Sequence, residues 1–242
     1  MTDAHVHEAL DGRCTDEALD GRDIDEALDG RDIDQALDGR DIDQALDGRY
    51  VHEESAAGFG TVRIRSLDAE ADAAVVHGWV SEERAAFWGM NGLTEDQVAE
   101  VYAHMAGLDT HHAFLVELDG EPVAVLQTYE PSEDRVGECY EVLPGDIGVH
   151  VLLAPAGERG ARPGWSSALM GVFASYVLVG MDRRRVVVDP DVRNDKALAR
   201  FVRQGFETGP VVTLPEIDLP DVYLPRKTAQ LAFLRREVAF PG

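Results

Sequence analysis

Two short apolar runs, separated by an amphipathic segment, dominate the second half of the chain. The first, residues 145–155, is bounded by Pro-Gly and Pro-Ala-Gly and contains one ionisable ring, His150. The second, residues 184–191, reaches Asp189 after three valines. Apolar runs flanked by turn residues predict buried strands, and the amphipathic residues 164–181 predict a helix. A strand, helix, strand order predicts adjacent parallel strands. This arrangement would bring His150 and Asp189 to one crevice near the strand ends.

Alternating and capped segments predict the remaining elements. Asp119-Gly120 between two alternating segments predicts a hairpin turn, and Asp68, Thr94 and Asn194 each predict a helix N-terminus. The predicted elements are a strand at 61–67, helices at 68–79, 81–88 and 94–105, a hairpin at 113–118 and 122–129, an irregular loop at 130–144, a helix at 194–204 and a strand at 227–235. This order predicts the α/β class, more closely an α+β mixed β-sheet flanked by helices.

Residues 8–52 form an array of nonapeptides such as EALDGRDID and QALDGRDID. A glycine in every unit argues against a continuous helix, and the array lacks the paired glycines of a calcium-binding β-roll. We therefore predict an acidic, largely disordered extension at 1–57 and a folded domain at 58–242. The alternative interpretation is a segment that binds a protein partner or a divalent cation through Asp-Gly-Arg-Asp-Ile-Asp.

Charge and cysteine content narrow the classes of partner. The 242 residues carry a formal net charge of −24, and residues 1–57 contribute −13 of it, with 18 acidic and 5 basic side chains. Such a surface disfavours nucleic acid and attracts cationic small molecules. The two cysteines, Cys14 and Cys139, fit a reducing cytoplasm. The sequence shows no membrane-span or signal-peptide pattern, so neither feature is expected.

Several motifs, in this order, resemble the GNAT acyl-CoA N-acyltransferases and, within them, the branch that builds hydroxamate siderophores. They are His77-Gly-Trp79, Phe87-Trp88-Gly-Met90, Gln127-Thr-Tyr-Glu130, Gly145-Asp-Ile-Gly-Val-His150, Val188-Asp-Pro-Asp-Val-Arg-Asn194, Gly205-Phe206 and Pro225-Arg-Lys227-Thr-Ala-Gln-Leu. The resemblance implies a GNAT fold for the domain after the repeats. It also implies transfer of an acyl group from acyl-CoA, either acetyl-CoA or succinyl-CoA, to lysine, N-hydroxylysine or N-hydroxycadaverine.

The resemblance implies catalytic roles for two residues. His150 would take the proton of the attacking nitrogen, and Asp189 would orient the imidazole or hold the substrate's ammonium. A backbone N–H of Val151 or Leu152 would serve the thioester oxygen. From the residues alone, His150 is alternatively a core histidine bonded to a carbonyl group. Asp189 is alternatively a strand-end cap, and Asp191 competes with it for the acidic role.

The resemblance also implies a coenzyme site. The family's phosphate loop, Arg/Gln-x-x-Gly-x-Gly/Ala before a helix, corresponds to Arg159-Gly-Ala-Arg162-Pro-Gly164, where Arg162 replaces the middle glycine. Backbone N–H groups at a helix N-terminus still hold pyrophosphate, and two arginines add positive charge. The residues expected to bind acyl-CoA are Val151, Leu152, Leu153, Arg159, Gly160, Arg162, Gly164, Trp165 and Asn194.

Each expected substrate contact has a structural alternative. The expected contacts are His77, Trp79, Trp88, Tyr129, Glu130, Asp191 and Lys227. The aromatic residues either line a substrate tunnel or pack helices, and Glu130 either binds the ammonium of a diamine or is an exposed loop acid. Asn194 is alternatively a helix cap, and Lys227 alternatively pairs with an acid. His111-His112 lack a third nearby ligand, so no metal site is expected.

The three acids of this crevice, Glu130, Asp189 and Asp191, predict a preference for substrates with a free ammonium. N-hydroxycadaverine would then serve at least as well as N-hydroxylysine, unless a nearby arginine or lysine reaches the amino-acid carboxylate. Two other functions stay open. One is a GNAT enzyme acting on another amine, such as an antibiotic or a protein lysine. The other is a non-catalytic scaffold that recruits partners through the repeats.

Overall fold

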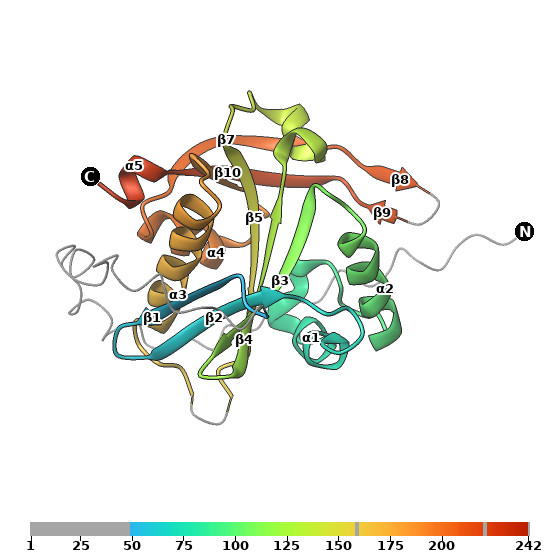
Figure 1. Ribbon diagram of the computed structural model, residues 1–242. Coiled ribbons are helices and arrows are strands. Elements are labelled where there is room, and N and C mark those ends of the chain that lie inside the picture. The colour runs from blue at the N-terminus through green and yellow to red at the C-terminus, as the bar shows by residue number, and fades with distance from the viewer. Residues whose placement is uncertain (1–48, 158–159, 220–221, 242) are drawn as a thin grey trace, which may run out of the picture. The chain divides into compact units, whose positions relative to one another are not determined.

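The computed structural model describes residues 49–157, 160–219 and 222–241, which contain a mixed sheet of eight strands (Figure 1). In sheet order the strands are β1 (His52–Ala56), β2 (Gly60–Ser66), β3 (His111–Leu118), β4 (Glu121–Tyr129), β5 (Asp146–Leu153), β6 (Arg185–Val188), β10 (Lys227–Arg235) and β7 (Glu207–Leu214). Neighbours are antiparallel except β5 and β6, which are parallel. A separate hairpin joins β8 (Ile217–Leu219) and β9 (Val222–Leu224).

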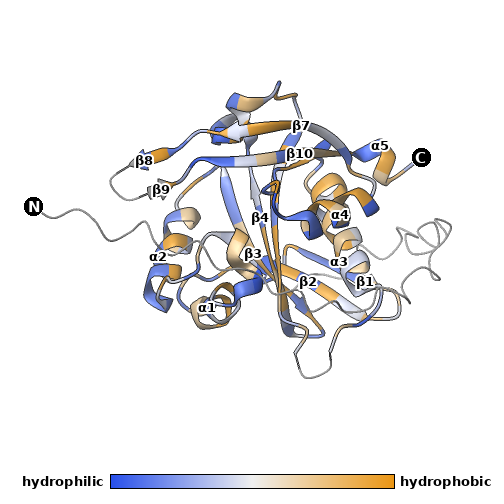
Figure 2. Ribbon diagram, turned by 180° about the vertical axis from the view of Figure 1, so that it is seen from behind, coloured by the Kyte–Doolittle hydropathy of each residue, from blue (hydrophilic) through white to orange (hydrophobic). Residues whose placement is uncertain are grey.

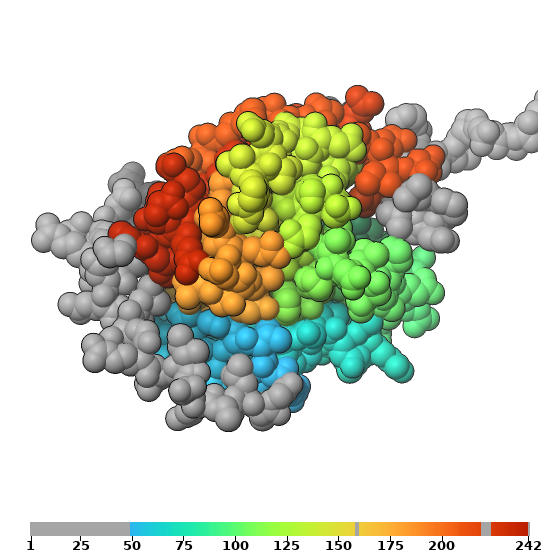
Figure 3. Space-filling view, turned by 45° about the horizontal axis from the view of Figure 1, so that its top comes forward, coloured from blue at the N-terminus to red at the C-terminus, as the bar shows by residue number. Residues whose placement is uncertain are grey.

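Helices cover both faces of the sheet. One face carries α1 (Ala73–Val80), the 3-10 helix η1 (Glu83–Trp88) and α2 (Glu95–Ala106), and the other carries α3 (Trp165–Ala174), its π-helical continuation η4 (Ser175–Gly180) and α4 (Asp195–Arg203). The 3-10 turns η2 (Pro131–Glu133) and η3 (Arg135–Cys139) follow β4, and α5 (Arg236–Ala239) follows β10. Hydrophobic residues gather in the central strands and in α3 (Figure 2), whereas α4 is amphipathic. Figure 3 shows the α3–α4 part of the chain, in orange, next to the β1–β2 hairpin, in blue.

The alternation of β5 decides which face its histidine occupies. Ile147 and Val149 lie in the core cluster of α3 and α4, whereas Leu152 lies in the cluster of α1 and α2. Because successive side chains of a strand point to opposite faces, His150 projects on the α1–α2 face. The sheet therefore directs this ring away from the larger core cluster.

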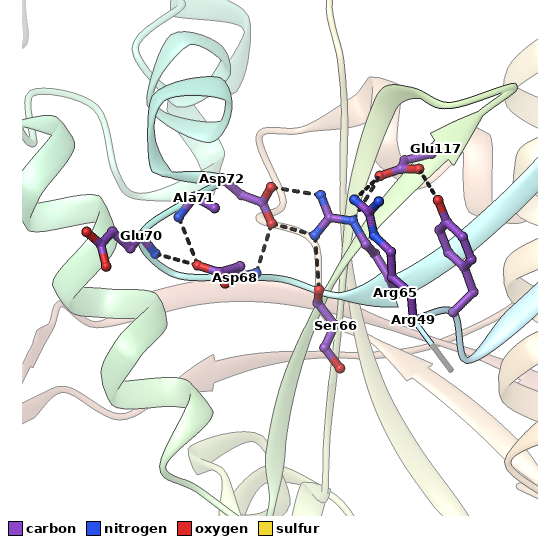
Figure 4. A network of polar contacts seen from close by, with 9 residues as sticks. Arg49, Arg65, Ser66, Asp68, Glu70, Ala71, Asp72 and Glu117 are labelled. Atoms are coloured by element: carbon purple, nitrogen blue, oxygen red, sulfur yellow. Dashed lines mark hydrogen bonds and ion pairs between the residues drawn. The ribbon is translucent and has the colours of Figure 1, made fainter. Parts of the chain in front are cut away.

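A buried polar network fixes the start of α1 to the sheet (Figure 4). The Arg65 guanidinium on β2 donates to both Asp72 oxygens, at 2.7 and 2.8 Å, and to Glu117 on β3, at 2.8 Å. Asp72 is the residue before α1, but its carboxylate makes no cap hydrogen bond. Asp68, the predicted cap, instead accepts from the backbone of the turn before the helix. The helix thus begins at Ala73, later than predicted, and the Asp68 carboxylate closes a turn before it.

Most predicted elements occur, including the parallel β5–β6 pair, the Asp119-Gly120 hairpin and the capping box of Thr94 at α2. Two strands were missed, β1 and β7, as was the small β8–β9 hairpin. β1 pairs with β2 along its whole length, so the sheet begins at His52, before the predicted boundary at Gly58. The repeat array up to residue 48 lies outside the described residues.

Candidate active site

The site is centred on a histidine–aspartate pair at the point where β5 and β6 diverge. His150 Nε2 lies 2.9 Å from Asp189 Oδ1, and Asp189 directly follows the last residue of β6. Asp189 is 4% exposed, whereas the His150 side chain is 40% exposed. A carboxylate at neutral pH only accepts hydrogen bonds, so Nε2 carries the hydrogen and Nδ1 keeps the lone pair. The accessible ring is thus arranged to take up a proton at Nδ1.

Two further donors hold the carboxylate of Asp189. The Tyr129 hydroxyl donates to Oδ1 at 3.1 Å, and the Lys227 ammonium donates to Oδ2 at 2.8 Å. Burial alone would raise the pKa of Asp189, but the hydrogen bonds of His150 and Lys227, the charge of Lys227 and the charge that His150 carries when protonated outweigh burial and hold this pKa well below its ordinary value. The carboxylate therefore stays ionised and fixed beside His150.

Gly148 on β5 makes room for Tyr129. A Cβ atom at this position would lie 2.1 Å from the Tyr129 ring, which is far inside van der Waals contact. Tyr129 ends β4 directly opposite Gly148, and its ring centroid lies 5.0 Å from that of His150. The glycine of the Gly-Val-His motif thus lets the phenol reach Asp189.

Beyond Gly148, β5 has an open edge. In the described part of the chain, β5 pairs with β6 through three residues only, while β4 follows it to Leu153. Ala154 N–H donates to the Val123 carbonyl at 2.8 Å. Backbone groups alternate between the two edges of a strand, so Leu152 also faces β4, and Val151 and Leu153 direct their N–H groups to the open edge. Of the two N–H groups considered for the thioester oxygen, the geometry favours that of Val151.

The N-terminus of α3 follows a glycine in the left-handed region, Gly164 with φ of 78°. Trp165, the first helical residue, packs against Phe59 with ring centroids 5.4 Å apart, and the Arg162 guanidinium lies over the same Phe59 ring at 4.7 Å. Gly160 also has positive φ, at 70°. Arg159 lies outside the described residues.

Positive charge lies close to this helix N-terminus. Lys196, Arg200 and Arg203 share one face of α4 by their spacing. With Asp195 and Ala199 they line a shallow cavity of about 460 Å³, in which the three cations outnumber the one acid. The end of α4 reaches the first turn of α3, because the Gln204 amide donates to Ser167 Oγ at 2.9 Å. Arg200 Nε is buried and has no hydrogen-bond partner among the described residues. The α3 N-terminus and this face of α4 together suit a polyanion.

The other expected acids have partners of their own. Asp191 accepts two hydrogen bonds from the Arg193 guanidinium and one from the Arg193 backbone N–H, all at 2.9 Å. Glu130 accepts from Arg183 through both carboxylate oxygens. Asn194 caps α4 by accepting from Ala197 N–H at 3.1 Å. The crevice is therefore not the uncompensated acidic site that the sequence predicted.

The three aromatic residues expected to line a tunnel differ in position. Trp79 is buried in the α1–α2 core cluster, and His77 Nε2 lies 3.1 Å from the Leu93 carbonyl oxygen. Of the three, Trp88 alone borders the His150–Asp189 pair, with its ring centroid 6.4 Å from that of His150. Residues two apart on a helix point in different directions, which explains why His77 and Trp79 do not share one wall.

Sequence reasoning missed two polar residues of this region, Gln127 beside His150 and Tyr102 near Trp88 and Gln127. Gln127 lies directly opposite His150 in the β4–β5 pairing and is 8% exposed. Burial raises the pKa of Tyr102 on α2 to about 12, despite the opposing influence of Trp88 and Gln127. The Tyr102 hydroxyl and the Trp88 indole N–H are buried without a hydrogen-bond partner in the described residues. A glutamine inside the apolar run of β4 was the available signal for this polar cluster.

Two further findings concern metals and membranes. The described residues contain no group of three or more histidine, cysteine, aspartate or glutamate side chains placed to hold a metal ion. Among the helices of the same residues, none combines the length and apolarity that crossing a membrane requires.

The mixed sheet, with its parallel β5–β6 pair and helices on both faces, has the architecture of a GNAT domain. Residues 68–214 match the family described as acetyltransferase (GNAT) domain, so the chain belongs to that family. The crystal structure of aminoglycoside acetyltransferase AAC(6')-Ib in complex with coenzyme A has the same fold, with a TM-score of 0.57 and 23% identity over 73% of this chain and 96% of that one.

Two curated relatives are named for hydroxylamine substrates. The chain is 31% identical to N(6)-hydroxylysine O-acetyltransferase of Escherichia coli, over 64% of this chain and 48% of the relative. It is 30% identical to N-hydroxyputrescine acetyltransferase of Acinetobacter baumannii, over 43% of this chain and 48% of the relative. The chain thus spans about half the length of the curated relatives it matches.

Proposed function

We propose that the protein transfers an acyl group from acyl-CoA, with acetyl-CoA as the first donor to test, to the hydroxylamine or amine of a hydroxamate-siderophore precursor. The observation that carries the proposal is the His150–Asp189 pair, 2.9 Å apart, beside the open edge of β5. Membership of the GNAT family supports the reaction class. The two relatives named for hydroxylamine substrates support the acceptor class.

In the proposed reaction the acceptor nitrogen attacks the thioester carbonyl carbon. A C–N bond forms, the C–S bond breaks, and the leaving thiolate receives the proton that His150 has accepted, so that the coenzyme leaves as its thiol. His150 Nδ1 takes the proton that the nitrogen loses, and Asp189 stabilises the resulting imidazolium through Nε2. The Val151 N–H at the open edge donates to the oxyanion of the tetrahedral intermediate. Tyr129 and Lys227 keep the carboxylate in place during the proton transfer.

The coenzyme phosphates would bind at the N-terminus of α3. Backbone N–H groups of a helix start attract phosphate oxygens, and Gly164 admits the turn that begins this helix. Arg162 and the cationic face of α4 supply positive charge to either side. Asn194 acts as a helix cap in this proposal, not as a coenzyme ligand.

The decisive experiment is mass spectrometry of products formed from mixed acyl-CoAs with lysine, N-hydroxylysine and N-hydroxycadaverine, with kanamycin as a competing acceptor. The expected result is an acylated hydroxylamine that is absent with a His150→Ala variant. Acylation of kanamycin alone would assign the enzyme to another amine. Absence of both transfer and acyl-CoA binding would favour the non-catalytic alternative.

A further inference from the structure

A small cavity adjoins the catalytic pair on the side of β10. Its volume is about 300 Å³, and it is lined by Asp191, Val192, Arg193, Arg226, Lys227 and Thr228. Lys227 connects the cavity to the site, because the carboxylate that it contacts at 2.8 Å is the one bonded to His150. Lys227 thus lies between the cavity and the His150–Asp189 pair.

Two segments build this cavity, and backbone bonds fix them together. Val192 N–H donates to the Thr228 carbonyl at 3.1 Å, and Asp191 forms a bridge with Ala229. The Arg193 guanidinium, held by Asp191, also lies over the Phe87 ring at 5.7 Å and so reaches toward η1. The backbone around the cavity is thus held by contacts between the two segments.

The charge of the cavity is opposite to that of the chain. Its lining holds three cations, Arg193, Arg226 and Lys227, and one acid, Asp191. Asp191 and Arg193 neutralise each other, and Lys227 pairs with Asp189. Arg226 is exposed and has no ion-pair partner among the described residues. The chain has a net charge of −24, yet this cavity beside the candidate active site carries uncompensated positive charge. Such a cavity attracts an anionic ligand.

We propose that this cavity binds the carboxylate of an amino-acid acceptor, with Arg226 as its main partner and Arg193 as the second. The inference rests on the proposed function and narrows it to hydroxylamines that carry an α-carboxylate, such as N-hydroxylysine. Arginine binds carboxylates through paired N–H donors, which gives both affinity and orientation. The neutralised acids of the crevice remove the reason to expect a preference for a diamine.

The test uses two acceptors that differ by one carboxylate, N-hydroxylysine and N-hydroxycadaverine, with acetyl-CoA as donor. Wild type should favour N-hydroxylysine in kcat/KM, and the preference should persist at moderate salt, because a direct contact is screened less than a long-range field. Arg226→Gln should lower kcat/KM for N-hydroxylysine by about tenfold or more, since hydrogen bonds to charged groups are worth that much. Its kcat/KM for N-hydroxycadaverine should stay within about twofold. Arg193→Gln should act in the same direction.

Arg235→Gln is the matched control. It makes the same charge change at the other end of β10, where Arg235 pairs with the exposed Glu207, and it should leave the ratio of the two substrates unchanged. An unchanged ratio in both cavity variants, with transfer intact, would overturn the subsite while leaving the proposed function standing. A raised KM for acetyl-CoA in place of a substrate effect would assign the cavity to a coenzyme phosphate and also overturn it. Failure of wild type to use either hydroxylamine would refute the proposed function itself.

Discussion

The Lys227 ammonium and His150 Nε2 bind different oxygens of one carboxylate, that of Asp189, at 2.8 and 2.9 Å. The side chain of Asp189 is 4% exposed, so almost no water competes for these oxygens. A carboxylate held from both sides cannot rotate away when His150 takes up a proton. This gives His150, the general base that we propose, a rigid support, and alignment of the reacting groups is what proton transfer requires.

We expect His150→Ala to retain the fold and to lose about a hundredfold or more in kcat, because removal of a general base typically has that effect. The side chain is 40% exposed and lies outside the main core clusters, so its loss should disturb packing little. Steady-state kinetics measures the loss of kcat, and circular dichroism shows whether the fold is retained. Unchanged kcat/KM in a folded variant would remove His150 from the mechanism.

Asp189→Asn should be more harmful to kcat than Asp191→Asn. The asparagine amide would have to place its NH2 group against either Lys227 or His150, both of which are donors toward this position. Asp191 instead pairs with an Arg193 side chain that is 76% exposed, so its loss has a smaller effect. The two variants are compared under saturating substrates. The reverse order would move the acidic role to Asp191.

The low pKa of Asp189 also predicts how stability depends on pH. The folded state holds this carboxylate ionised, so its stabilising contribution is fully present above the ordinary aspartate pKa of about 4 and is lost as pH falls toward the lower folded value. Breaking a buried ion pair costs about 3 kcal/mol, and Asp189→Asn should show a loss of this order in urea unfolding at pH 7. At pH 3 the difference from wild type should shrink by about 1 kcal/mol. A difference that grows as the pH falls would contradict the assignment.

Gly148→Ala should destabilise the protein and reduce activity together. The added methyl group would lie 2.1 Å from the Tyr129 ring, so the ring must move away from Asp189. Overpacking of this kind costs about 1–3 kcal/mol. In a double variant with Tyr129→Ala, the methyl group no longer meets the ring, so the unfolding free energies should be strongly non-additive. Additive effects would show that the close approach of the two residues is not what requires glycine.

The sequence pattern of strand, helix and strand predicts one part of the site, the His150–Asp189 pair. His150 and Asp189 come from two apolar runs joined by a helical segment, and parallel pairing of such runs brings their ends together. The partners Arg183 and Arg193 could not be assigned, because ion pairs between loops leave no periodic signal. Their absence from the prediction is why the crevice was expected to attract cations.

The missed strands have physical reasons of their own. β1 reads His-Glu-Glu-Ser-Ala, with few apolar positions, and it lies at the edge of the sheet. β7, at the opposite edge, contains Pro210, which cannot donate a hydrogen bond to a neighbour and argues against a strand in local reasoning. Tyr102 was hidden because a tyrosine on the apolar face of α2 has the spacing of ordinary core packing.

The position of β1 separates two truncations that the sequence alone would treat alike. Removal of residues 1–48 should leave acyl transfer and CoA affinity nearly intact, because the sheet begins at His52. Removal of residues 1–57 should destabilise the domain. It deletes β1, whose five residues pair with β2, and the Tyr50 hydroxyl that donates to the buried Glu117 at 3.0 Å. It would also uncover the β2 edge, which invites aggregation.

Thermal unfolding and kcat/KM of the two purified variants provide the comparison, with full-length protein as the reference. Equal stability of both would show that β1 contributes little to the domain, and loss of activity without loss of CoA affinity on removal of 1–48 would make the repeats part of the site.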